Sequence, residues 1–202
     1  VYTYYNTTDN RQEADPGPSH AGKLERIDYP NGSSIAYTYD VLGRVYALTT
    51  QASATSSPYT TTYGYDENGN LSSILDPFGG LTDYTYDELD RLATRTLPNG
   101  VLTTWSFDNR DRLLSIVHED TNIPVGQAGR IVASFTYSHH LNAVGEPYMI
   151  TREDGSYVEL DYDPALRLKE ERHYLSGGTW SQTITYDYDD QGNRTSQRYT
   201  GP

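Results

Sequence analysis

The sequence predicts an all-β protein built from tandem antiparallel β-hairpins. Three observations support this prediction. A short aromatic-x-aromatic-Asp motif recurs along the chain at a basic spacing of about 21 residues. Turn signals follow most copies of this motif and precede several of them. Aromatic, β-branched, Gly and Pro residues recur too often for an amphipathic helical pattern to accumulate.

The motif defines the first strand of each expected hairpin. Its two aromatic rings are two residues apart, so in a strand they point to the same face and the residue between them points to the other. Each hairpin should therefore carry a row of tyrosines on one face. The clear copies are Tyr37-Thr38-Tyr39-Asp40, Tyr63-Gly64-Tyr65-Asp66, Tyr84-Thr85-Tyr86-Asp87, Trp105-Ser106-Phe107-Asp108 and Tyr186-Asp187-Tyr188-Asp189, the weaker ones are Phe135-Thr136-Tyr137-Ser138 and Leu160-Asp161-Tyr162-Asp163, and Tyr2-Thr3-Tyr4-Tyr5 is a degenerate copy.

A tight turn is expected directly after each motif. Gly and Asp accept a positive φ at low cost, and an Asp that opens a turn can bond its own backbone, so Asp-x-x-Gly predicts such a turn. An Arg that ends the turn can pair with the Asp or pack on a tyrosine ring. The turn endings are Gly43-Arg44, Gly69-Asn70, Asp90-Arg91, Asp111-Arg112, Leu166-Arg167 and Gly192-Asn193.

A second turn signal precedes the motif and completes the hairpin. Its glycine stands about seven residues before the second aromatic, which leaves about fourteen residues to the next such turn, enough for two strands and two turns. The returning strands, such as 24–29 and 71–75, alternate apolar and polar residues less cleanly than a period of two requires. The second turns are Pro30-Asn31-Gly32, Asp76-Pro77-Phe78-Gly79, Pro98-Asn99-Gly100 and Asp154-Gly155, and loop insertions are expected at 6–21, 50–58, 120–129, 138–147 and 176–178.

Composition limits the partners and the core. With 15 Lys and Arg against 28 Asp and Glu, the 202-residue chain has a net charge of −13 and should repel nucleic acids and anionic lipids. No apolar run reaches the roughly 18 residues of a membrane span, so no membrane insertion is expected. The chain has no cysteine and 20 tyrosines. Because Leu, Ile, Val and Phe are scarce, we expect a core built largely from tyrosine rings.

No catalytic, metal or cofactor site is predicted. Asp recurs at the motif turns. Stabilisation of the turns explains this recurrence, whereas a single active site would not. The segment from Asp187 to Gly192 has the opening spacing of a calcium loop, but Arg198 stands where a bidentate Glu is needed. His139 and His140 would face opposite sides of a strand, and a surface loop is their expected place. His20, His118 and His173 are scattered, and neither a nucleophile elbow nor a phosphate-binding loop occurs.

The recurring Tyr-x-Tyr-Asp-x-x-Gly-Arg-Leu pattern with preceding Pro-x-Gly turns resembles the YD-repeat, or rearrangement-hotspot (RHS) repeat, family. The segments 37–45 and 63–71 match it best, and the resemblance extends from about Gly22 to Asn193. It implies a curved, spiralling β-ribbon that forms an arc of a hollow shell. In insecticidal toxin complexes and polymorphic bacterial toxins such a shell sequesters a toxic cargo, and in teneurins it belongs to an adhesion ectodomain.

The chain departs from the family pattern at five positions and lacks one segment. The self-cleaving aspartate segment that ends the toxin arrays is absent, so no autoproteolysis is expected. The departures are Ser138 for the Asp, Phe107 for the second Tyr, Leu166 for the turn Gly, and Asp90 and Asp111 in the same turn position. The residues predicted to form the structural motif are Tyr37, Tyr39, Asp40, Gly43, Arg44, Tyr63, Tyr65, Asp66, Gly69, Tyr84, Tyr86, Asp87, Arg91, Trp105, Phe107, Asp108, Arg112, Tyr137, Tyr162, Asp163, Arg167, Tyr186, Tyr188, Asp189 and Gly192.

Taken with the resemblance, the sequence predicts one array of about seven to eight hairpins over residues 1–202, as a section of a longer protein. The expected function is non-catalytic: part of a shell that encloses or displays a toxin or adhesin domain. Its partners would be the remaining repeats or that cargo, and open sheet edges could also pair with another copy. The alternative is a carbohydrate- or protein-binding surface module that uses tyrosine rows and the loops 120–129 and 138–147. The expected location is secreted or on a bacterial cell surface, with the export signal outside this sequence.

Overall fold

A computed structural model describes residues 1–4, 21–122, 130–140 and 145–202 of the chain. These residues form sixteen β-strands, and the chain divides into two compact units, Val1–Pro98 and Asn99–Pro202. None of the described residues belongs to a helix long and apolar enough to cross a membrane. The prediction of an all-β fold made of antiparallel hairpins is therefore confirmed.

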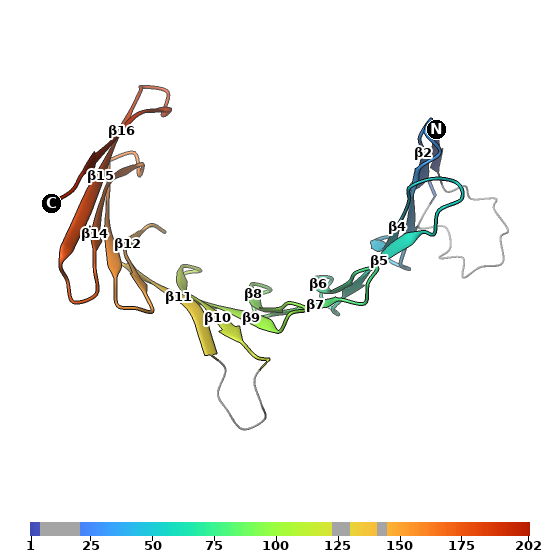
Figure 1. Ribbon diagram of the computed structural model, residues 1–202, viewed down its shortest axis with the longest axis horizontal. Helices are drawn as coiled ribbons and strands as arrows, with labels where there is room; N and C mark the ends of the chain where they lie inside the picture. Colours follow the sequence, from blue (N-terminus) through green and yellow to red (C-terminus); the bar gives the residue numbers. More distant parts are fainter. Residues whose placement is uncertain (5–20, 123–129, 141–144) are drawn as a thin grey trace. The chain divides into compact units, whose positions relative to one another are not determined.

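The first unit is a meander in which each strand pairs antiparallel with the next one along the chain. Figure 1 shows its strands in this order, from the blue amino-terminal end into green. They are β1 (Tyr2–Tyr4), β2 (Leu24–Asp28), β3 (Ser34–Tyr39), β4 (Val45–Gln51), β5 (Tyr59–Tyr65), β6 (Leu71–Leu75), β7 (Leu81–Tyr86) and β8 (Leu92–Thr96).

The second unit repeats the same arrangement with longer strands. Parts of the predicted loops are strand here: Asp120 ends β10, and Ser138 lies in β11. Residues 6–20, 123–129 and 141–144 of the predicted insertions lie outside the described ranges. The strands are β9 (Val101–Phe107), β10 (Leu113–Asp120), β11 (Arg130–His139), β12 (Pro147–Arg152), β13 (Tyr157–Tyr162), β14 (Leu168–Tyr174), β15 (Trp180–Tyr188) and β16 (Arg194–Thr200).

The turns at both ends of the hairpins are closed in the same way. In the turn after β3, the Gly43 amide donates to the Asp40 carbonyl and the Asp40 amide donates to the Arg44 carbonyl, both over 2.8 Å. The fourth residue is left-handed, with a φ of 78° at Gly43, which is a type I turn followed by a one-residue bulge. The residues that replace glycine there take the same conformation: Asp90, Asp111 and Leu166 have φ values of 58°, 62° and 60°. This conformation costs a leucine about 1–2 kcal/mol.

A β-bulge stands opposite the second aromatic in most copies of the motif. Thr38 pairs with Ala47 but Tyr39 pairs with Val45, so Tyr46 is an extra residue in β4. The same irregularity recurs opposite Tyr65, Tyr86, Phe107, Tyr162 and Tyr188. A bulge shifts the alternation of inward and outward side chains by one residue. This shift is the reason why the returning strands alternate imperfectly in sequence.

The prediction of a tyrosine core is wrong. The buried apolar residues in the described part of the chain are Ala47, Val158 and Ile184, and no described tyrosine is buried. Each unit is a single layer of consecutively paired strands, and a second layer is what would complete the burial of large side chains. The motif tyrosines from Tyr37 to Tyr188 are therefore half-buried against their neighbours in the sheet.

The two faces of the sheet differ in character. In β7, Thr82, Tyr84 and Tyr86 are half-buried, while Leu81 and Thr85 are exposed. We call the face that carries the motif aromatics the tyrosine face and the other the opposite face. In the first unit the opposite face is rich in short hydroxyl side chains, with Oγ1 atoms in contact between Thr49 and Thr60 (2.9 Å) and between Thr85 and Thr94 (2.6 Å).

Candidate functional site

The Asp of each motif closes its turn with one carboxylate. In the turn from Asp108 to Arg112, Oδ1 accepts hydrogen bonds from the amides of Arg110 (2.8 Å) and Arg112 (3.0 Å), and Oδ2 accepts one from Arg112 Nε (2.7 Å). The Arg112 amide, with the other donors, lowers the pKa of Asp108 to about 2. The carboxylate is thus held ionised by donors from its own turn.

We call this set of hydrogen bonds between the motif Asp and its own turn a clasp. The clasp recurs along the chain in two versions. In the first version an arginine Nε donates to Oδ2 of the motif Asp, over 2.7 Å in each case, at Asp40, Asp87 and Asp163. In the second version an asparagine Nδ2 donates to Oδ2. Asn70 donates to Asp66 over 3.3 Å, and Asn193 donates to Asp189 over 3.0 Å. Desolvation works against the ionisation of several of these carboxyls, yet the turn donors lower the pKa of Asp40, Asp66, Asp87, Asp163 and Asp189.

The turn arginines also reach the following repeat. The Arg44 guanidinium lies 4.2 Å from the Tyr65 ring centroid, and the Arg167 guanidinium lies 4.7 Å from that of Tyr188. Arg167 Nη1 donates to the Asp189 carbonyl over 3.2 Å. A cation above an aromatic face is attractive. Each of these arginines therefore joins its own turn to the next one.

The second aromatic of the motif makes a contact that sequence reasoning missed. In five copies it is a tyrosine whose hydroxyl donates to a backbone carbonyl of the preceding repeat, at the residue that stands opposite the preceding second-aromatic position, whereas Phe107 has no hydroxyl to donate. Tyr65, for example, bonds the Val45 carbonyl, and Val45 pairs with Tyr39. We call these contacts rungs. They run from Tyr39 to Leu24 (2.7 Å), Tyr65 to Val45 (2.8 Å), Tyr86 to Leu71 (2.9 Å), Tyr162 to Pro147 (3.0 Å) and Tyr188 to Leu168 (2.7 Å).

Burial contributes to the strength of the rungs. Desolvation raises the pKa of Tyr39, Tyr65, Tyr86 and Tyr162 above the usual value of a tyrosine. A raised pKa keeps the hydroxyl protonated and able to donate. The only sequence signal for a rung is the spacing of the second aromatics, because the accepting carbonyl is present in every residue.

The motif copy predicted at 135–138 lies two residues too early in the sequence. The sequence places its second aromatic at Tyr137, but the bulge and the rung occur at His139, whose Nε2 lies 2.8 Å from the Leu113 carbonyl. A carbonyl only accepts, so Nε2 carries the proton. The expectation of a surface loop for His139 is therefore wrong. The bulge makes His139 the structural equivalent of tyrosine, which sequence identity alone does not reveal.

The first aromatics of the motifs lie on the tyrosine face and pack across the sheet. Tyr37 pairs with Leu48, Tyr63 with Ile74, Trp105 with Ile116 and Tyr137 with Ile150. Tyr84 and Tyr186 pair with the polar residues Arg95 and Gln197. The Tyr186 hydroxyl donates to Glu171 Oε1 over 2.7 Å, and burial together with this bond raises its pKa to about 12.

The carboxylates of the calcium-like segment each accept hydrogen bonds from protein donors. Asp187 contacts Arg198 Nη2 (2.9 Å) and Ser196 Oγ (2.7 Å), whereas Asp189 closes its turn. The described residues contain no group of three or more potential metal ligands. His118 contacts Thr103, His173 contacts Glu171, and His20 lies outside the described residues.

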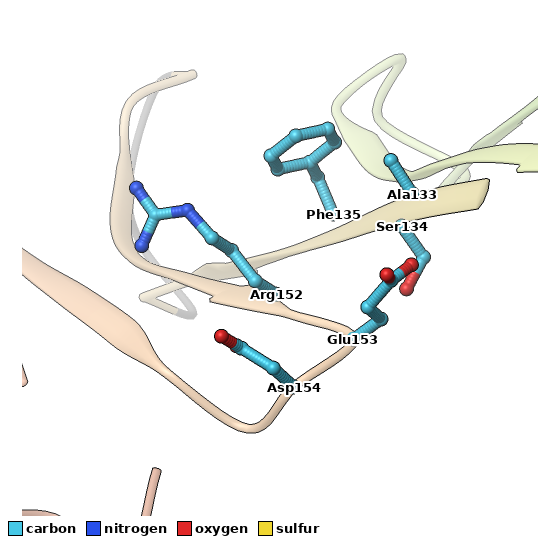
Figure 2. Close-up of a pocket in the computed structure, with 6 residues that line it drawn as sticks. All are labelled: Ala133, Ser134, Phe135, Arg152, Glu153 and Asp154. Atoms are coloured by element: carbon cyan, nitrogen blue, oxygen red, sulfur yellow. The ribbon is translucent and has the colours of Figure 1, made fainter. Parts of the chain in front are cut away.

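A shallow pocket of about 140 Å³ lies between β11 and the end of β12. Figure 2 shows Ala133, Ser134 and Phe135 on one strand and Arg152, Glu153 and Asp154 at the end of the next strand and the turn after it. Sites for small molecules usually enclose about 300–1,000 Å³. Among the described residues, the arrangement that recurs along the sheet is the series of clasps and rungs, and its chemistry is structural.

Comparisons with known proteins find a matching repeat family and solved structures of similar fold. Residues 65–102 and 86–123 match the family model described as RHS Repeat. No curated protein matches the chain. The crystal structure of TcdB2-TccC3 is 16% identical over the whole chain, with a TM-score of 0.59, and the match spans 13% of that protein.

Further solved structures share the fold. The Photorhabdus luminescens Tc holotoxin pore with a TccC3 variant is 16% identical over 91% of this chain, and TcdB2-TccC3-Cdc42 is 17% identical over 91%. Both have a TM-score of 0.55, and the matched part is 12% of each longer chain. The RHS Repeat match lies within residues 65–123, and the solved structures share the fold, so the resemblance to the YD-repeat, or RHS-repeat, family is confirmed.

Proposed function

We propose that the chain is a non-catalytic wall section of an RHS-repeat shell that encloses or displays a toxin or adhesin domain. The observation that carries this proposal is the series of rungs. Each rung ties one hairpin to the one before it by a side-chain hydrogen bond between adjacent strands, in addition to the strand ladder. Repetition of such a contact makes a sheet stiff along its length, as a wall requires.

The chemistry of the described residues supports a structural role. The motif carboxylates are occupied by turn donors, and the turn arginines contact carboxylates, rings and carbonyls. Neither set is left to polarise a substrate. The partners of this section would be further repeats and a cargo domain, and the protein would be exported or displayed by a bacterium. Residues 1–202 would form one continuous array within it.

Fractionation of the source tests this proposal. An antibody raised against the chain is used to blot culture medium, cell surface and cytosol. We expect a reactive band far larger than 22.7 kDa outside the cytosol. A band at 22.7 kDa, or a large band confined to the cytosol, would overturn the proposal.

Enclosure needs a separate measurement on the same immunopurified protein. Brief trypsin treatment of the native protein should leave an internal cargo fragment intact, while the same treatment after unfolding in urea should digest it. Equal digestion before and after urea would show that the section does not enclose a cargo.

A further inference from the structure

One rung is made by an imidazole instead of a phenol. Strands β10, β11 and β12 follow one another in the sheet (Figure 1), and His139 of β11 reaches back to the Leu113 carbonyl at the start of β10 over 2.8 Å. Because that carbonyl accepts, the proton of the neutral ring is on Nε2. His139 Nδ1 is buried and has no hydrogen-bond partner. The neutral ring therefore uses its one donor and leaves its one acceptor empty.

Protonation would turn that empty acceptor into a donor. An imidazolium donates from both nitrogens, and a buried donor without an acceptor loses its hydrogen bonds to water without replacement. Histidine is the side chain that ordinarily changes charge between pH 5 and pH 8. The phenol of a rung tyrosine stays neutral there, and burial raises the pKa of four of these tyrosines above the ordinary value. Among the rungs in the described part of the chain, only the one at His139 has a donor that titrates in this range.

A fixed cation faces the same ring. Arg112 Nη1 donates to the carbonyl of His140, the residue after His139, over 2.9 Å. Arg167 makes the equivalent bond in its own repeat, and there the guanidinium lies 4.7 Å from the ring centroid of the rung tyrosine Tyr188. A cation attracts a neutral aromatic ring but repels an imidazolium. The Arg112 side chain is only 13% exposed, so water screens this repulsion weakly.

The other charged and titratable groups around the ring are not bonded to Nδ1. On the β10 side, Asp108 pairs with Arg112 over 2.7 Å. On the β12 side, Glu146 stands just before the strand, and burial together with its charge raises the pKa of the rung tyrosine Tyr162. His140, next along β11, is exposed. A second proton on the ring therefore meets no acceptor that is already in place.

Two other histidines of the sheet have partners that can accept a proton. His173 Nε2 lies 2.9 Å from Glu171 Oε2, so a carboxylate balances a charge on that ring. His118 Nδ1 lies 3.0 Å from the Thr103 hydroxyl, which both donates and accepts. The unpartnered nitrogen thus sets His139 apart from both.

We propose that His139 makes the joint between β10 and β11 sensitive to acid, so that below about pH 6 its protonation loosens β11 and β12 from the hairpin β9–β10. The tyrosine rungs of the other repeats hold under the same conditions. The array then has one place that opens in mildly acidic surroundings. This device rests on contacts within the sheet, and it does not depend on enclosure of a cargo.

Hydrogen–deuterium exchange of the whole 202-residue chain tests the joint. Exchange is measured at pH 7.5 and pH 5.5 and corrected for the intrinsic rate at each pH. We expect the amides of β11 to lose about tenfold in protection at pH 5.5, while those of β5 and β6 keep theirs. Equal protection of β11 at both pH values would overturn the proposal. A gain would also overturn it, since the protonated ring would then have found an acceptor, and so would an equal loss in every strand.

Variants assign the loss to the ring. H139Y should abolish it, because a phenol does not titrate in this range, and H139Q should do the same, because its amide keeps a donor. R112N replaces the arginine by the residue found in the clasps of Asp66 and Asp189, and it should make the loss smaller by removing the neighbouring charge. H140F, at the exposed adjacent histidine, is the matched control that keeps the full loss. An undiminished loss in both H139Y and H139Q would show that another group titrates.

Discussion

The hairpin β7–β8 and the hairpin β11–β12 differ in how many of the repeat contacts they keep. The first has both devices: the Asp87 clasp with Arg91 and the Tyr86 rung to the Leu71 carbonyl. In the second, His140 stands in the Asp position and His139 forms the rung to Leu113. The rung therefore survives a change of residue type when the replacement still carries a donor at its tip. The clasp depends on a carboxylate and is lost with it.

The difference separates two roles. The clasp is local, since all its partners come from five consecutive residues, and it shapes one turn. The rung joins residues 15–26 positions apart. A repeat can lose its clasp and stay attached to its neighbour, but loss of the rung removes a contact between neighbouring repeats. Substitutions at these positions test that division of roles.

Removal of a rung tyrosine should have the largest effect. We expect Y86A to lower the free energy of unfolding by about 2–3 kcal/mol, because it removes a half-buried ring and its hydrogen bond. Y46A, at an exposed bulge position, should change it by no more than about 0.5 kcal/mol. Urea denaturation of both variants measures the difference. Equal stabilities would show that the rung contributes nothing.

Loss of the hydrogen bond from His139 should destabilise the fold less than loss of a rung tyrosine. H139F removes the donor to the Leu113 carbonyl and should cost about 1 kcal/mol. H139Y restores the usual donor and removes a buried Nδ1 that has no partner, so it should be at least as stable as the wild type. Thermal unfolding of the two variants gives the comparison. A more stable phenylalanine variant would contradict the role of His139.

The left-handed leucine offers a stabilising change of about 0.5–1 kcal/mol. Leu166 is 52% exposed and has a φ of 60°, so L166G should relieve backbone strain with little loss of burial. The gain is reduced by the greater flexibility of glycine in the unfolded chain. L42G, in an exposed turn position without positive φ, should be neutral or destabilising. A loss of stability in L166G would show that the strain is absent.

The acid dependence of one clasp should be the smallest effect. The folded-state pKa of Asp108 is about 2, below its ordinary value of 3.8. A lowered pKa stabilises the fold at pH values above the unfolded value, and this contribution is lost as the pH falls through the folded value. D108N should therefore show a shallower loss of stability than the wild type between pH 4 and pH 2. Parallel pH profiles in urea would show that the Asp108 carboxylate has the same pKa in both states.

The turns and strands were predictable because their causes lie close together in the sequence. Asp-x-x-Gly places a carboxylate and a left-handed residue within one turn, and Asp90 and Asp111 tolerate that conformation as glycine does. The spacing of two residues between motif aromatics places both on one face. Such rules need no knowledge of the rest of the chain.

The misassigned copy at Tyr137 shows where this reasoning ends. An aromatic-x-aromatic pattern starting at Phe135 resembled the motif more than Tyr137-Ser138-His139 did. What defines the position is the bulge opposite it and the carbonyl of Leu113 that it reaches, and both belong to other strands. The prediction of a tyrosine core is wrong for a related reason, because burial depends on whether a second layer covers the face.

The sequence by itself determined the hairpin period, the turn chemistry and the face on which the motif aromatics lie, since backbone conformation and alternation are local properties. Only the tertiary structure decided the bulges, the rungs and the equivalence of His139 with tyrosine. Each of these depends on register between strands, and register brings together residues whose separation along the chain varies from repeat to repeat.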